Sequence, residues 1–136
     1  MKQLEELMGR KILSVQLDAA KVYLKFITDQ GDVLYGCYAD CCSESWINHI
    51  NGMSELVGGT VEDVDEVDFH ALLKIEPEAT RQEFDRVLFH RIKTEKGWCT
   101  LEFRNSNNGY YGGWLEEVAS VPKDEKVEMQ NITEDF

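Results

Sequence analysis

The sequence predicts a single α+β domain, a mostly antiparallel β-sheet with one or two short helices. Three observations predict it: short alternating apolar and polar segments recur, tight turn sequences separate them, and few stretches have helical spacing. A length of 136 residues suits one domain with its own core. We expect residues 1–122 to form this ligand-binding domain and residues 123–136 to form an acidic, mobile tail.

Turn residues divide the first part of the chain into short elements. Residues 4–8 have helical spacing, and residues 12–17, 21–28 and 33–39 read as strands. The sequence Asp-Gln-Gly-Asp at residues 29–32 is typical of a turn, so the second and third strands should form a hairpin.

Residues 43–51 are predicted to form a helix on the core face of the sheet. Ser43 is a typical N-cap residue. Three apolar residues then follow at the spacing of one helical stripe, namely Trp46, Ile47 and Ile50.

Residues 60–69 carry five carboxylates and are predicted to form an acidic strand or strand-loop. Residues 56–64 also match residues 7–15 in the order of their apolar residues and glycine. Each copy is expected to form a short helical turn that leads into a strand, although a chance match explains the pattern equally well.

Residues 87–93 and 98–104 are predicted to form a hairpin joined by the four-residue loop 94–97. Antiparallel register then pairs Lys93 with Trp98, Arg91 with Thr100, Phe89 with Glu102 and Val87 with Arg104. The opposite face is apolar except for His90, which is expected to be a hydrogen-bonded core histidine rather than a catalyst.

The face that carries these eight residues combines cations with aromatic rings. Arg91, Lys93 and Arg104 can neutralise phosphates, and aromatic rings beside them can stack a base. Asn105, close to this face, can read the edge of the base. The alternative is a solvated outer face with cross-strand ion pairs.

The sequence Asn107-Asn108-Gly109 predicts a further turn, because Asn and Gly tolerate a positive φ. Extending the sheet across this turn pairs Arg104 with Tyr111. The predicted ligand-binding residues are therefore Phe89, Arg91, Lys93, Trp98, Arg104, Asn105, Asn108 and Tyr111.

Charge limits the classes of partner. The chain carries 14 basic and 26 acidic residues, a net charge of −12, which argues against binding a nucleic-acid polymer. Half of the basic residues lie within residues 74–104, so a small anion can still be held there.

No apolar run is long enough for a membrane helix, and the N-terminus lacks a secretory signal, so a reducing cytosol is expected.

The sequence offers no metal site, no cofactor site and no catalytic residues. The four cysteines, Cys37, Cys41, Cys42 and Cys99, form no Cys-x-x-Cys pair, and the three histidines are scattered. No nucleophile is paired with a base, so we expect a binding protein rather than an enzyme.

Four short sequences together resemble the first anti-Thoeris family of phage proteins. They are Asp-Cys-Cys-Ser-Glu-Ser-Trp at residues 40–46, Leu-Val-Gly at 56–58, Phe-His-Arg-Ile-Lys-Thr at 89–94 and Asn-Ser-Asn-Asn-Gly-Tyr-Tyr at 105–111. Members of that family sequester cyclic ADP-ribose isomers made by TIR-domain enzymes, without cleaving them, at pockets between protomers. One departure is that Gly112 and Gly113 follow the two tyrosines where the family continues with serine.

The resemblance implies a homo-oligomer in the cytoplasm of an infected bacterial cell, where it binds a nucleotide-derived signalling molecule and thereby evades host immunity. It also implies that an aromatic residue stacks on adenine, an arginine meets phosphate and an asparagine contacts the ligand, with Phe89, Arg91, Arg104, Asn105 and Asn108 as candidates. The alternative is an acidic interaction protein or nucleic-acid mimic that blocks a host protein, as the net charge and residues 62–68 suggest.

Overall fold

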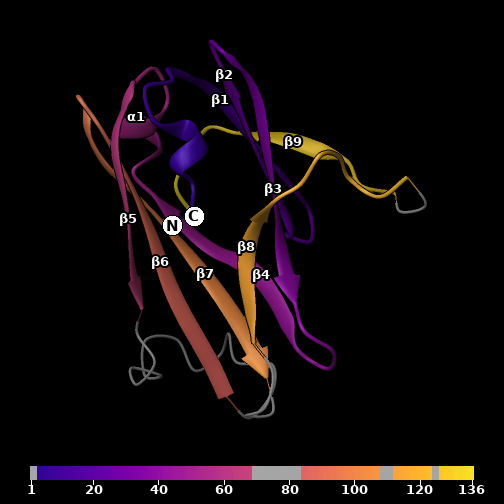
Figure 1. The fold of residues 1–136 in the computed structure, drawn as a ribbon. Helices are drawn as coiled ribbons and strands as arrows, with labels where there is room; N and C mark the ends of the chain where they lie inside the picture. Colours follow the sequence, from indigo (N-terminus) through magenta and orange to yellow (C-terminus); the bar gives the residue numbers. More distant parts are fainter. Residues whose placement is uncertain (1–2, 69–83, 108–111, 124–125) are drawn as a thin grey trace.

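Two antiparallel sheets make up the protein (Figure 1). The structure is a computed structural model that describes residues 3–68, 84–107, 112–123 and 126–136. Its elements are the 3-10 turn η1 (Glu5–Leu7), the helix α1 (Met53–Leu56) and the strands β1 (Ile12–Asp18), β2 (Tyr23–Thr28), β3 (Gly31–Ala39), β4 (Glu44–Asn51), β5 (Val61–Asp68), β6 (Phe84–Thr94), β7 (Gly97–Asn107), β8 (Gly113–Glu117) and β9 (Met129–Ile132).

The strand order is β8-β3-β2-β1-β9 in the first sheet and β4-β7-β6-β5 in the second. Neighbouring strands are antiparallel throughout both sheets. The predicted class, a single mostly antiparallel domain with short helices, is therefore confirmed. Within the described ranges, no helix is both long and apolar enough to cross a membrane.

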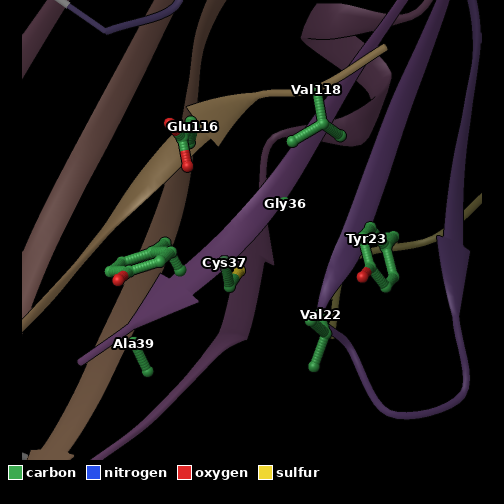
Figure 2. Close-up of a pocket in the computed structure, with 8 residues that line it drawn as sticks. Val22, Tyr23, Gly36, Cys37, Ala39, Glu116 and Val118 are labelled. Carbon is green, nitrogen blue, oxygen red and sulfur yellow. The ribbon is translucent and has the colours of Figure 1, made fainter. Parts of the chain in front are cut away.

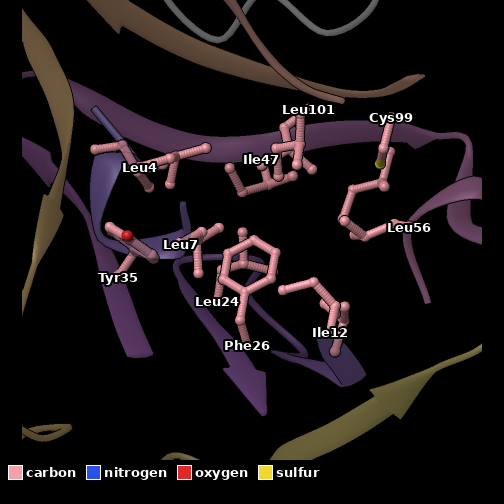
Figure 3. Packing of buried hydrophobic residues seen from close by; sticks show 14 of the residues in the cluster. Leu4, Leu7, Ile12, Leu24, Phe26, Tyr35, Ile47, Leu56, Cys99 and Leu101 are labelled. Carbon is pink, nitrogen blue, oxygen red and sulfur yellow. The ribbon is translucent and has the colours of Figure 1, made fainter. Parts of the chain in front are cut away.

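One apolar cluster fills the space between the sheets (Figure 3). Ile47 and Leu101 from the second sheet face Leu24 and Phe26 from the first, and all four are fully buried. Leu7 of η1 enters the same cluster. Burial of a side chain of this size contributes about 1.5–3 kcal/mol, so this shared core holds the two sheets together.

The β6–β7 hairpin has the predicted register. Lys93 pairs with Trp98 and Val87 pairs with Arg104, and the pairing runs without a break from Phe84 to Thr94. The predicted core face is also confirmed, because all its residues are buried: Leu88, His90, Ile92, Cys99, Leu101 and Phe103.

The predicted helix at residues 43–51 is wrong, because this segment is the strand β4. The register of β4 with β7 shifts between Ile47 and His49, which indicates a β-bulge. A bulge inserts one residue into the alternation, so Ile47 and Ile50 both enter the core although they are three residues apart. That spacing imitates the apolar stripe of a helix.

The acidic segment forms β5, as predicted. Its irregular apolar spacing has the same cause, because a register shift against β6 lies between Val61 and Asp63 and leaves both Val61 and Val64 buried. The two matching segments also behave as predicted: η1 leads into β1, and α1 leads into β5. They lie side by side, joined by a bridge between Lys11 and Thr60.

The C-terminal segment, predicted to be a tail, contributes β9 to the first sheet, where it pairs with β1. Beyond β9, Phe136 exchanges two backbone hydrogen bonds with Ile50. Asp135 Oδ1 accepts hydrogen bonds from the backbone N–H groups of Gly52 and Met53, at 3.0 and 2.8 Å. Residues close to the C-terminus thus hold the start of α1, which has no side-chain cap of its own.

Replacing Gly113 by alanine is predicted to destabilise the protein. A methyl group there would overlap Ser45 Oγ and the carbonyl oxygen of Tyr38. Overpacking of this kind costs about 1–3 kcal/mol, measurable by urea denaturation. Gly36→Ala is the matched control, because its methyl group would lie 3.4 Å from Tyr23 Cε1, an ordinary contact. Equal midpoints for the two variants would contradict the close approach at Gly113.

Candidate functional site

The predicted cationic and aromatic side chains meet at one end of the outer face of the second sheet. Trp98 begins β7 beside the hairpin loop and keeps 41% of its surface exposed. The guanidinium carbon of Arg91 lies 4.8 Å from the centre of the indole ring, and Lys93 Nζ lies 6.0 Å from it. We call Arg91, Lys93 and Trp98 the Trp98 cluster. Phe89 is half-buried on the same face.

The two cations of the Trp98 cluster are not equivalent. Arg91 makes a two-point contact with Asp65, from Nε at 2.7 Å and from Nη2 at 2.6 Å, which raises its pKa. Lys93 forms no ion pair with any residue that the structure describes, and it is exposed. Asp65 therefore holds Arg91 beside the ring, while the donors of Lys93 remain available to an anion.

Arg104 lies at the other end of this face and is engaged internally. It is only 2% exposed, with Nη1 2.8 Å from Asp85 Oδ2 and Nε 3.2 Å from Glu102 Oε2. Asn48 donates a hydrogen bond of 2.7 Å to the same Glu102 oxygen, and Trp46 Nε1 donates one of 3.1 Å to Asn48 Oδ1. Two carboxylates meet the positive charge of Arg104, and polar side chains extend the contacts to β4.

Arg104 and Trp98 do not form one site. They are six residues apart on β7, and at about 3.4 Å per residue their backbones are about 20 Å apart. The Cα partners of Arg104 are Val87 and Trp46, so the predicted pairing with Tyr111 is wrong. Tyr111 itself lies outside the described residues.

Asn105 lies on the opposite face of the second sheet from Arg104 and Trp98, because adjacent residues of a strand point to opposite sides. It is fully buried, donates a hydrogen bond of 2.9 Å to Ser45 Oγ and accepts one of 2.9 Å from Asn107. Asn108 lies outside the described residues. The structure therefore brings Arg91, Lys93 and Trp98 together, with Phe89 on the same face, and it places Arg104 and Asn105 elsewhere.

His90 is in the core, as predicted, but it lacks the hydrogen bond that was expected. Neither ring nitrogen has a hydrogen-bond partner among the described residues. Its Nδ1 lies 3.8 Å from Glu66 Oε1. Burial lowers the pKa of His90 to about 4, and the nearby Glu66 carboxylate opposes this only in part. The imidazole is therefore neutral at neutral pH.

The four cysteines fall into two classes. Cys37 and Cys99 are buried, which raises the pKa of both thiols, that of Cys99 to about 12. Cys41 and Cys42 are exposed in the turn between β3 and β4, with their Sγ atoms 3.3 Å apart. Across the described ranges, no group of three or more Cys, His, Asp or Glu side chains is arranged to hold a metal ion.

The sequence analysis missed a groove of about 210 Å³ on the outer face of the first sheet (Figure 2). Tyr23 on β2 and Glu116 on β8 are the cross-strand neighbours of Gly36 on β3. Tyr38 lines the groove as well. An isolated glycine within a strand marks a bulge or a close approach of the backbone. Gly36, which lies between Tyr35 and Tyr38 in the sequence, was therefore the signal from which this groove could have been predicted.

Comparisons with known proteins place the chain in a family. Residues 5–116 match the family model described as "Domain of unknown function (DUF7448)". The chain is also 30% identical over 110 residues to "Uncharacterized protein L278" of Acanthamoeba polyphaga mimivirus, covering 76% of this chain and 80% of the relative. No solved structure matches the chain.

Replacing Arg104 by methionine is predicted to destabilise the fold, because it leaves two buried carboxylates without their cation. Breaking a buried ion pair in this way costs about 3–5 kcal/mol, which urea denaturation would show. The matched control is Arg86→Met, because Arg86 is 40% exposed and pairs with Asp68. That loss should stay below about 1 kcal/mol. Equal losses would contradict a structural role for Arg104.

His90 is predicted to make the free energy of unfolding depend on pH between about 4 and 6.5. The pKa of His90 is about 4 in the folded protein, against an ordinary value of 6.5 for a solvated histidine, so the unfolded chain binds more protons in this range. Stability therefore falls as the pH falls from 6.5, by roughly 3 kcal/mol in total.

The test compares the wild type with His90→Leu by urea denaturation at several pH values. The difference in unfolding free energy between the two should change across this range, since carboxylate titration is common to both. A constant difference would show that His90 does not titrate with folding.

Proposed function

The chain belongs to the DUF7448 family, and from the site itself we propose that it binds a small, nucleotide-derived signal and withholds it from an immune effector without cleaving it. The observation that supports this proposal is the Trp98 cluster: an exposed indole flanked by two cations, on a chain with a net charge of −12.

The chemistry of the Trp98 cluster suits a base joined to a phosphate. The exposed indole offers a flat surface on which adenine can stack, and stacking of one base is worth about 1–3 kcal/mol. Lys93 lies beside that surface with its ammonium group available for a phosphate oxygen. Arg91, whose charge is balanced by Asp65, lies over the indole ring and supports it.

Binding without cleavage is consistent with the state of His90 and of the two buried thiols. His90, the histidine on the hairpin, is fully buried, so it cannot reach a ligand on the outer face. The pKa of the buried thiols Cys37 and Cys99 is raised, which keeps them protonated at neutral pH. A sponge needs only tight and reversible contacts, and the Trp98 cluster can provide these.

The identity of the signal rests on the resemblance to the anti-Thoeris family, which stays a prediction. It implies a cyclic ADP-ribose-type or cyclic nucleotide molecule, bound by a homo-oligomer in the cytoplasm of an infected cell. The similarity to a mimivirus protein supports a viral setting for this role.

The edge strand β5 favours a second candidate, an acidic interaction protein that blocks a host protein. It is the terminal strand of the second sheet. Four of its carboxylates, Glu62, Asp63, Glu66 and Asp68, belong to exposed residues. A row of negative charge on a sheet edge can imitate nucleic acid or meet a basic partner, and such binding weakens steeply with salt.

The test is a capture experiment with the products of a TIR-domain enzyme. The protein is mixed with the products, separated from the free fraction and denatured by heat, and the released molecules are identified by chromatography. We predict recovery of the intact signal from the wild type. Trp98→Ala and Lys93→Ala should each reduce recovery about tenfold or more.

Lys25→Ala is the matched control, because Lys25 belongs to β2 in the other sheet and should not change recovery. Far-UV circular dichroism verifies that each variant is folded. The proposal fails if the wild type captures no such molecule, or if both cluster variants capture it as well as the wild type. Salt-sensitive binding of a host protein without capture would favour the second candidate.

A further inference from the structure

The groove over Gly36 is formed by a missing side chain in a cross-strand row. Tyr23, Gly36 and Glu116 are neighbours across β2, β3 and β8, and Figure 2 shows Tyr23 and Glu116 on opposite sides of Gly36. Neighbouring strands lie about 4.8 Å apart, so the backbones that carry the tyrosine and the carboxylate are about 10 Å apart, and β3 itself places no side chain between them.

Two tyrosines provide aromatic surface to the groove. Tyr23 Cε1 lies 3.4 Å from the position that a Cβ atom at Gly36 would occupy, so this ring leans over the floor. Tyr38 is 43% exposed, and its ring lies against Trp114 with centroids 4.3 Å apart and planes tilted by 32°. This contact holds the ring of Tyr38 at the end of the groove.

Charge decides which ligand the groove suits. Glu116 is exposed and forms no ion pair with any residue that the structure describes, and the groove contains no basic side chain. The faces of the tyrosine rings are electron-rich and attract cations. The net charge of −12 raises the local concentration of cations further.

We propose that the groove lined by Tyr23, Tyr38 and Glu116 is a binding site for an alkylammonium group. The carboxylate supplies the opposite charge, the tyrosine rings supply cation–π contacts, and Gly36 leaves space for the methyl or methylene groups of the ligand. A neutral ligand of the same shape would gain the apolar contacts alone. The site lies on the first sheet and does not depend on the Trp98 cluster.

The test titrates the protein with choline and with its neutral analogue, in which carbon replaces the quaternary nitrogen. Binding is followed by calorimetry and by the indole fluorescence of Trp114, which packs against Tyr38. Choline should bind at least about tenfold more tightly than the analogue, because only the cation gains the electrostatic contacts. Equal affinities would overturn the proposal.

Two variants locate the binding. Glu116→Gln, which removes the charge, and Gly36→Ala, which fills the floor, should each weaken choline binding about fivefold or more. Glu62→Gln is the matched control, because this exposed carboxylate lies on the other sheet. Choline binding that neither groove variant changes, or no choline binding at all, would overturn the proposal.

A second arm distinguishes two sources of the ammonium group. A peptide that carries trimethyllysine is titrated in parallel with choline. Tighter binding of the peptide, lost in Glu116→Gln, would assign the site to a protein partner. Equal binding would assign it to a small molecule, and either result supports recognition of an alkylammonium group.

Discussion

The continuous pairing of β6 with β7 is the constraint on which the rest of the structure depends. Both strands have 11 residues, and every residue from Phe84 to Thr94 has a partner in the other strand. Because side chains alternate along each strand, one register decides which residues enter the core and which face outward. The edges of this hairpin then pair with β4 and β5, which completes the second sheet.

The same register sets two different environments on one outer face. Near the loop, Trp98 and Lys93 are exposed, and their functional groups can meet a ligand. At the other end, Arg104 is enclosed with Asp85 and Glu102. Burying an arginine with two carboxylates costs desolvation free energy, and removing one partner of such an ion pair is strongly destabilising. We therefore interpret Arg104 as structural and assign recognition to the exposed end.

The sequence predicted those features that depend on local pattern. The hairpin register followed from a four-residue loop and strict alternation, and Trp98, Lys93 and Arg91 were grouped on that basis. The sequence predicts a helix at β4 because one bulge at Asn48 changes the spacing of the apolar residues. A bulge depends on the partner strand, so a single segment cannot reveal it.

Contacts between distant segments explain the remaining differences. Arg104 is predicted to meet phosphate, but Asp85 of β6 pairs with it, and Asn48 of β4 donates a hydrogen bond to its second carboxylate partner, Glu102. The groove over Gly36 joins Tyr23 to Glu116, which are far apart in the sequence. The strand β9, with the sequence Met-Gln-Asn-Ile, pairs with β1 although it lies within a polar and acidic C-terminal segment. In each case the contact depends on residues of another strand, so the sequence of one segment alone does not predict it.

The central claim is that recognition belongs to the exposed end of the outer face and that the Arg104 end is structural. The indole N–H groups of Trp98 and Trp46 report on these two ends, and Trp46 Nε1 donates its hydrogen bond to Asn48 within the Arg104 network. The direct measurement is a titration with cyclic ADP-ribose followed by two-dimensional NMR of the indole N–H signals. The account predicts that the Trp98 signal shifts on binding while the Trp46 signal stays in place. A shift of the Trp46 signal with no change at Trp98 would contradict it.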